Sequence, residues 1–137
     1  VGNLLQNAFK FTRPGTEVVL SAYATADRIL IEVEDRCGGL PSGQAEDMFR
    51  PFVQGSDDKS GLGLGLSISQ RSVAANNGVL SGRHLADGGC IFTIDLRPRP
   101  LPAGALSPYA PSPGPARPVL MRLPAHTRPA LISKALH

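Results

Sequence analysis

Glycine and leucine alternate in the segment 61–68, GLGLGLSI, and the run continues into sequence that can be helical. Glycines at alternate positions allow backbone conformations that other residues avoid, and they let a ligand approach the main chain. A helix that begins at such a loop presents unpaired N–H groups and the positive end of its dipole to an anion, usually a phosphate. A glycine run alone is more typical of a flexible surface loop, so the rest of the chain must decide.

Two asparagines lie one helical turn apart in the segment 2–12, GNLLQNAFKFT. The apolar residues of this segment repeat with helical spacing and predict a helix that ends before Pro14: Leu4, Leu5, Ala8 and Phe11. Asn3, Asn7 and Lys10 share the adjoining face. Asparagine is a poor residue for a helix interior. The pair therefore indicates either a ligand site or a solvated polar face.

A hairpin is predicted next, because residues 17–25 and 29–34 are rich in β-forming residues and flank a short turn. Apolar and polar residues alternate in the second strand, so we expect a sheet covered on one face. This strand ends at Asp35, beside the turn Arg36-Cys37-Gly38-Gly39. A carboxylate there can accept a hydrogen bond from a ligand N–H while the backbone comes close. An aspartate that merely caps the turn is the simpler interpretation.

Further elements follow from local pattern. We expect a short helix over 44–52, a mobile polar loop over 53–60, a helix over 64–77, and a second hairpin from strands 79–85 and 90–96. The apolar residues of helix 64–77 form no clean stripe, so we expect it to be extensively buried, and Asn76-Asn77-Gly78 should end it. In the last strand four apolar side chains share one face: Cys90, Phe92, Ile94 and Leu96.

Charge and proline are distributed unevenly along the 137 residues. Residues 1–97 carry nine basic and eleven acidic side chains, a net charge of −2, whereas residues 98–137 carry five basic and no acidic ones. Ten of the thirteen prolines also lie in the second segment. We therefore expect one domain over 1–97 and a Pro/Arg-rich tail over 98–137 that is mostly disordered. Because the basic balance belongs to the tail, we expect no nucleic-acid partner for the domain.

Two sequence features that indicate membrane insertion or secretion are not found in this chain. No apolar run is long enough to span a bilayer and no signal-peptide pattern is present, so we expect no membrane contact by this segment. Cys37 and Cys90 make no disulfide framework and fit a reducing compartment. The chain starts at Val1 rather than Met and enters helical sequence at once, which is typical of a fragment.

In their order along the chain, these segments resemble the ATP-binding domain of bacterial two-component sensor histidine kinases. NLLQNAFKFT resembles the N box, VEDRCGGLP the first glycine box, MFRPF the F box, GLGLGLSI the second glycine box and GGCIFTIDL the closing strand. The resemblance covers about residues 1–97. It implies an α+β fold, a two-layer α/β sandwich with a mixed, mostly antiparallel sheet and helices on one face, known as the Bergerat or GHKL ATPase fold. Because the chain starts at the N box, the first strand and helix of that fold would be missing.

The resemblance implies a role for each residue that matches a motif. Asn7 would coordinate a Mg²⁺ ion that bridges the phosphates of ATP, and with Lys10, which would meet a phosphate, it would form the catalytic pair. Asp35 would accept from the adenine amino group and so select ATP over GTP, because guanine has a carbonyl there. The remaining cofactor-binding residues would line the pocket, wrap the triphosphate or, with Phe49, anchor the lid: Asn3, Gly39, Phe52, Gly61, Leu62, Gly63 and Gly65.

One position departs from the family pattern. The first glycine box usually reads Asp-x-Gly-x-Gly, and Cys37 stands at its first glycine. Asp35 and Gly39 remain, so we expect adenine recognition to be intact. Cys37 needs a backbone angle that a Cβ tolerates, and we expect it to be a small buried filler.

Three other nucleotide-binding classes fit less well. A Walker P-loop requires Gly-Lys-Ser/Thr, but Leu66 follows Gly65. A dinucleotide fingerprint requires a strand before its glycines, where this chain has a charged loop. The gyrase, mismatch-repair and chaperone ATPases carry a water-activating Glu at the position of Asn3, and an amide cannot act as a general base. We therefore expect bound ATP to be kept from water.

The resemblance implies that the chain binds Mg-ATP and supplies the γ-phosphate for autophosphorylation of a histidine in an upstream dimerisation domain. The implied partners are that domain and the receiver domain of a response regulator, within a homodimeric protein. The implied location is cytoplasmic, with the whole protein possibly anchored in the inner membrane. Two alternatives stay open: a nucleotide-binding regulatory module, and a truncated product without kinase activity, whose tail results from a change of reading frame.

Overall fold

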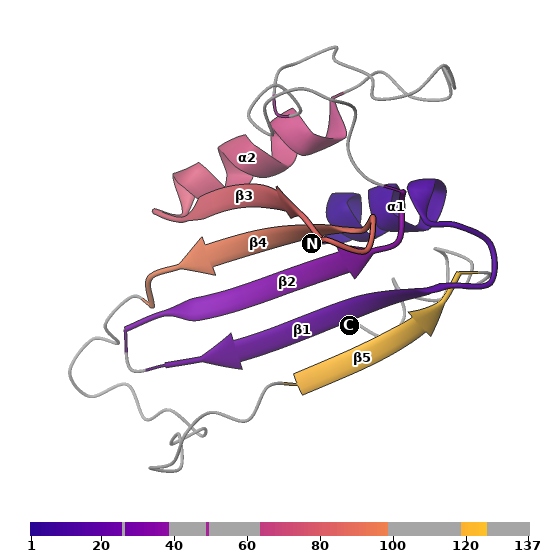
Figure 1. The fold of residues 1–137 in the computed structure, drawn as a ribbon. Coiled ribbons are helices and arrows are strands. Elements are labelled where there is room, and N and C mark those ends of the chain that lie inside the picture. Colours follow the sequence, from indigo (N-terminus) through magenta and orange to yellow (C-terminus); the bar gives the residue numbers. More distant parts are fainter. Residues whose placement is uncertain (26, 39–48, 50–63, 99–118, 126–137) are drawn as a thin grey trace.

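The described part of the chain is an antiparallel sheet with two helices on one side (Figure 1). The computed structural model describes residues 1–25, 27–38, 49, 64–98 and 119–125. The helices are α1 (Gly2–Phe11) and α2 (Gly65–Ala75). The strands are β1 (Glu17–Ala24), β2 (Ile29–Asp35), β3 (Val79–His84), β4 (Cys90–Leu96) and β5 (Val119–Pro124). This arrangement confirms the predicted α+β class with helices on one face.

The sheet has the order β3-β4-β2-β1-β5, and all four of its strand pairs are antiparallel. The described strands are thus wholly antiparallel, in agreement with the expected mostly antiparallel sheet. The physical reason lies in the connections. β1–β2 and β3–β4 are both hairpins, as predicted, and the segment that contains α2 brings β4 rather than β3 beside β2. β2 is thus a central strand, with β1 and β4 on its two sides.

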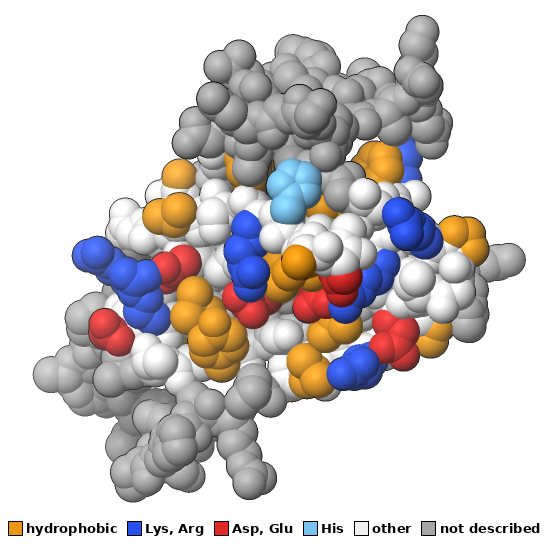
Figure 2. Space-filling view, in the orientation of Figure 1, with side chains coloured by type: hydrophobic (Ala, Val, Ile, Leu, Met, Phe, Trp, Pro, Cys, Tyr) orange, Lys and Arg blue, Asp and Glu red, His pale blue; other side chains and the backbone are white. Residues whose placement is uncertain are grey.

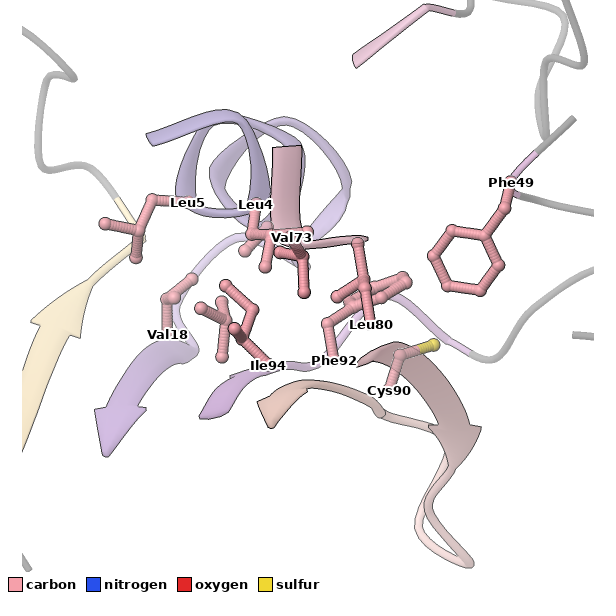
Figure 3. Close-up of a cluster of buried hydrophobic side chains, with 11 residues drawn as sticks. Leu4, Leu5, Val18, Phe49, Val73, Leu80, Cys90, Phe92 and Ile94 are labelled. Carbon is pink, nitrogen blue, oxygen red and sulfur yellow. The ribbon is translucent and has the colours of Figure 1, made fainter. Parts of the chain in front are cut away.

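The core lies between the helices and the sheet (Figure 3). Its fully buried side chains come from α1, β1, β2 and β4: Leu4, Leu5, Val18, Val33 and Cys90. The predicted apolar face of β4 is confirmed, since Cys90, Phe92 and Ile94 are buried and Leu96 packs against them. Burial of such side chains stabilises a fold by about 1.5–3 kcal/mol each.

The apolar stripe of α1 differs from the prediction at one residue. Leu4, Leu5 and Ala8 are buried, but Phe11 is 39% exposed and Phe9 packs against the core instead. The helix ends at Phe11, and the next core-facing position falls on Thr12, which is buried. Phe11 therefore lies beside the stripe rather than in it.

α2 is less buried than expected. Val73 is 8% exposed and Leu66 packs against the core, but Ile68 is 51% exposed. Among the described elements the helix packs mainly against α1 and β3, and Ala74 and Ala75 are exposed together with Ile68. Its end is as predicted: Asn77 has φ 56°, and the Gly78 N–H donates to Val73 O at 2.9 Å.

β5 corrects the prediction of a disordered tail. It pairs with β1, Leu123 packs against the core, and Arg122 forms an ion pair with Glu17 at 3.2 Å. The apolar residues before Pro124 contain no proline and pair with an edge of β1 that would otherwise be open. Local composition missed this strand because its partner is 100 residues away in sequence. The rest of residues 99–137 lies outside the described part, apart from Ala125.

Other predicted elements cannot be compared with the structure. The helix over 44–52, apart from Phe49, and the loop over 53–60 lie outside the described residues. Neither α1 nor α2 has the length and apolar character needed to cross a bilayer. On the face seen in Figure 2, acidic and basic side chains alternate rather than gather by sign. The described ion pairs on this sheet include Arg28–Asp95 and Arg36–Glu34.

Candidate functional site

The predicted asparagine helix and glycine run meet where α2 begins. Asn3 Nδ2 donates to Gly65 O at 3.4 Å. A Cβ built on Gly65 would lie 3.9 Å from both amide atoms of Asn7, an ordinary van der Waals distance, so Gly65 lies directly beside the Asn7 amide. The residue before the helix, Leu64, makes no side-chain cap. Two asparagine amides and the uncapped first turn of a helix therefore face the same space.

Asp35 lies at the end of β2, directly opposite Cys90 in the sheet register. It is 3% exposed, and its Oδ1 accepts the Cys37 N–H at 3.0 Å. Burial raises the pKa of Asp35 above its ordinary value of 3.8, and this rise is opposed only in part by hydrogen bonds from Cys37 and the Cys90 backbone and by the charge of Arg36. A buried carboxylate that already accepts from the protein can also accept from a ligand N–H, because its two oxygens together offer about four lone pairs.

A pair of hydrogen bonds joins the end of α1 to the loop that follows Asp35. Thr12 Oγ1 accepts the Arg36 N–H at 3.1 Å, and the Arg13 N–H donates to Arg36 O at 3.1 Å. The helix that carries Asn7 is thus fixed to the strand end that carries Asp35. Sequence reasoning missed Thr12, although the break in the apolar stripe after Ala8 was a usable signal.

Cys37 takes the place of a glycine without strain. In the described chain the positive φ in this turn belongs to Gly38, at 92°, and not to Cys37. Cys37 is half-buried and packs against the core, in agreement with its expected role as a small filler. Sequence reasoning did not foresee its neighbour, Cys90, whose thiol has its pKa raised by burial and by a hydrogen bond with Cys37.

The other predicted site residues are spread around this centre. Lys10 is exposed, and its Nζ lies 5.1 Å from the centroid of the Phe11 ring. Phe49 is 8% exposed and contacts Phe92 edge to face, with 6.4 Å between ring centroids (Figure 3). The remaining predicted residues lie outside the described chain: Gly39, Phe52, Gly61, Leu62 and Gly63.

The described site thus has a buried acceptor at one end and an open, amide-lined helix start at the other. The sheet ends and α1 hold the two ends together, at the edge of the sheet where β2 finishes (Figure 1). An acceptor for a base and donors for an anion on one scaffold fit a nucleotide. Asn7 also offers an amide oxygen, a hard ligand suited to Mg²⁺.

Comparison with known proteins agrees with this geometry. Residues 1–100 match the family described as histidine kinase-, DNA gyrase B- and HSP90-like ATPases. The sensor protein TorS of Escherichia coli (strain K12) is 38% identical over 96 residues, which is 70% of this chain and 10% of TorS. The alginate biosynthesis sensor protein KinB of Pseudomonas aeruginosa is 36% identical over 96 residues, 70% of this chain and 16% of KinB. The chain therefore spans only a small part of these relatives.

Solved structures show the same fold. The mycobacterial sensor histidine kinase MprB superposes with a TM-score of 0.63 at 26% identity, covering 72% of this chain and 70% of MprB. Full-length ShkA, solved in complex with AMPPNP, gives a TM-score of 0.59 at 33% identity, covering 69% of this chain and 19% of ShkA. With the family match over residues 1–100, these likenesses show that the chain belongs to the histidine kinase-, DNA gyrase B- and HSP90-like ATPase family, as an ATP-binding domain of the sensor histidine kinase type.

Proposed function

We propose that the chain binds Mg-ATP between α1, α2 and the end of β2, and that it supplies the γ-phosphate for phosphorylation of a histidine on another domain. The observation that carries this proposal is the meeting of Asn3 and Asn7 with Gly65, on a helix tied through Thr12 to the strand that ends at Asp35. This meeting supports a base acceptor and a phosphate site on one scaffold.

At the base end, Asp35 accepts from the exocyclic amino group of adenine. Its carboxylate is already desolvated, so a ligand N–H does not have to displace bulk water from it. Guanine presents a carbonyl oxygen at the same position, and two acceptors repel each other. This end therefore selects ATP over GTP. Gly39, which is assigned to this end by the family motif, would let the backbone come close to the base.

At the phosphate end, Asn7 supplies the amide oxygen that holds Mg²⁺, and Lys10 supplies a positive charge to a phosphate. The ion neutralises charge on the phosphate oxygens when it is bound. The uncapped N–H groups at the start of α2 add donors to the same anion. The glycine run up to the first residue of the helix wraps the triphosphate, and two phenylalanines anchor the lid over it: Gly61, Leu62, Gly63 and Gly65, with Phe49 and Phe52.

Asn3 supports a transferase rather than a hydrolase. Its amide cannot act as a general base, and its Nδ2 donates to Gly65 O. Bound ATP therefore stays unhydrolysed until a phosphate acceptor reaches the site. The expected rate of ATP hydrolysis by the chain alone is negligible, and a chaperone-like rate that is lost in Asn3→Ala would contradict this.

The wider setting is proposed from the relatives, which are sensor proteins of which this chain spans a small part. The acceptor histidine lies in a dimerisation domain upstream, the whole protein is a homodimer, and the phosphate passes on to the receiver domain of a response regulator. ATP places the reaction in the cytoplasm.

Calorimetric titration of the chain with AMPPNP and with GMPPNP, each with Mg²⁺ and with a chelator, tests the nucleotide site. We expect AMPPNP to bind in a Mg²⁺-dependent manner and GMPPNP to bind at least about tenfold more weakly, the effect of one unpaired buried acceptor. Equal affinity for both nucleotides, or binding that ignores Mg²⁺, would contradict the proposed site.

The transfer step needs the acceptor. A longer protein that includes the preceding dimerisation domain should become labelled on histidine by γ-labelled ATP, and the label should be stable to base and labile to acid. Labelling that survives Asn7→Ala at saturating ATP would remove Asn7 from the catalytic pair.

A further inference from the structure

Three potential metal ligands gather at the sheet edge where β2 ends and β4 begins. The carboxylate of Asp35 and the thiols of Cys37 and Cys90 have donor atoms that all lie within 4.8 Å of one another. Asp35 and Cys90 are partners in the strand register, so both side chains point to the same, helix-covered face of the sheet. Strand pairing therefore brings Cys90 beside Asp35, which Cys37 follows by two residues.

The turn after β2 places the third donor over the first two. Gly38, directly after Cys37, has a φ of 92°, the left-handed conformation that glycine adopts in turns. The Gly38 backbone lies against the β3–β4 turn, where a Cβ built on Gly88 would be 3.7 Å from the Gly38 carbonyl carbon. Two turns therefore pack on each other and hold Cys37 above Cys90. The Cys37 N–H bond to Asp35 Oδ1 fixes the carboxylate beside the thiols.

We propose that Asp35, Cys37 and Cys90 form a zinc-binding site. Two sulfur donors and one carboxylate oxygen match the ligand preference of Zn²⁺, and in a tetrahedral site three protein ligands leave a fourth position for water. On binding, each thiol forms a Zn–S bond and releases its proton to solvent, while the carboxylate binds as it is. Thiolates select against Mg²⁺, so this ion is distinct from the one assigned to Asn7.

Burial favours such an ion once it is bound. Cys90 is fully buried and Asp35 is 3% exposed, whereas half-buried Cys37 provides the side from which the ion enters. Three anionic ligands without a cation would be costly there, and Zn²⁺ cancels most of that charge. Small adjustments of the side chains bring donors from within 4.8 Å to the Zn–S and Zn–O distances of about 2.0–2.3 Å from a common centre.

Zinc and adenine exclude each other at Asp35. A carboxylate oxygen that coordinates zinc no longer accepts from an amino group, and the ion with its water occupies the space beside the base. This consequence rests on the proposed nucleotide site, whereas the metal site itself does not. The zinc site therefore turns the base end of the nucleotide pocket into an inhibitory site.

Titration of the reduced chain with Co²⁺, in the absence of nucleotide, tests the metal site. We expect one equivalent to produce the near-ultraviolet charge-transfer absorption of cobalt–thiolate bonds, and one equivalent of Zn²⁺ to remove it. The absorption should be lost in Cys37→Ser and Cys90→Ser and weakened in Asp35→Asn. Cys37→Ser alters a half-buried side chain, so it remains informative if Cys90→Ser fails to fold.

Two results would overturn the metal site. The first is wild-type protein without the absorption, or with the same absorption in Cys37→Ser. The second is an absorption that persists in concentrated urea, because the unfolded chain keeps its two thiols but loses the strand pairing that brings them together.

A second arm measures AMPPNP affinity at fixed excess Mg²⁺ with buffered free Zn²⁺. At ten times the zinc dissociation constant, competition should weaken apparent nucleotide affinity about elevenfold. Cys37→Gly, which keeps the backbone N–H to Asp35, is the matched control: its affinity should not respond to zinc, which also excludes an effect of zinc on the nucleotide.

The two arms separate the two proposals. Suppose that the protein binds cobalt and that Asp35→Ala weakens AMPPNP binding. If zinc then left AMPPNP affinity unchanged, the proposed competition between zinc and adenine would be overturned. If the protein bound cobalt, but the protein free of cobalt and zinc did not bind AMPPNP, the metal site would be supported and the proposed function contradicted.

Discussion

The two ends of the proposed nucleotide site are built in opposite ways. At the base end, Asp35 is buried, bonded to Cys37 at 3.0 Å, and tied to α1 by the Thr12–Arg36 hydrogen bond. At the phosphate end, one long hydrogen bond of 3.4 Å joins Asn3 to Gly65, and the first turn of α2 has no side-chain cap. The base end is preorganised by sheet register, whereas the phosphate end is left open for its ligand to complete.

The difference has an energetic consequence. A preorganised acceptor loses little conformational freedom on binding, but it carries the cost of a desolvated charge before the ligand arrives. An open helix start carries no such cost and instead needs ions and a lid to bind tightly. Base recognition should therefore be sensitive to single substitutions, and phosphate binding should depend on Mg²⁺.

The largest expected effect is at the base end. Asp35→Ala removes the acceptor and should weaken AMPPNP binding by about 1–3 kcal/mol, the range for a buried polar partner. Calorimetry measures it. Asp95→Ala, which removes another acid of the same sheet that is paired with Arg28, is the control and should leave affinity unchanged. Equal losses in both variants would show that the effect is a general one of charge.

At the phosphate end, Asn7→Ala should cost about 1 kcal/mol of AMPPNP affinity in Mg²⁺, and almost nothing in a chelator. Its control is Asn76→Ala, whose amide donates to Ser72 O at the far end of α2. If Asn7→Ala weakened binding equally with and without Mg²⁺, the amide would be a contact to nucleotide and not to the ion.

The tie between the two ends is tested at Thr12. Thr12→Val keeps the shape of the side chain but leaves the Arg36 N–H without its partner, so it should cost about 1 kcal/mol of unfolding free energy and also weaken AMPPNP binding. Thr25→Val removes the equivalent bond to the Arg28 N–H, also 3.1 Å, at the opposite end of the β1–β2 hairpin. Its unfolding free energy can fall, but its AMPPNP affinity should not change.

The smallest effect is the pH dependence of stability. Because the pKa of Asp35 is raised in the fold, the folded state binds more protons, and the unfolding free energy falls as pH rises from 3.8 through the folded pKa. Asp35→Asn should lack this loss and be the more stable protein at neutral pH. Urea unfolding with a chelator present, from pH 3 to 8, measures it. If the unfolding free energy of the wild type rose relative to that of Asp35→Asn with increasing pH, the assigned direction of the Asp35 pKa shift would be contradicted.

Prediction from sequence succeeded where structure is local. Both hairpins, the helix that carries Asn3 and Asn7, and the stop at Asn77 follow from periodicity and turn residues within a few positions. It failed at Phe11, whose place beside the stripe depends on where the helix ends, and at β5, whose formation depends on the free edge of β1. The two errors have different causes: the first depends on the exact end of a helix, and the second on a strand partner that is distant in sequence.

The sequence by itself determined the family, the order of elements and the residue types at each end of the site, because motif spacing and alternation are local properties of the chain. Only the tertiary structure decided that Gly65 meets Asn3 and Asn7, that Thr12 holds the loop after Asp35, and that two cysteines 53 positions apart lie beside one carboxylate. Those contacts depend on strand register and helix packing, which are set by burial over the whole sheet.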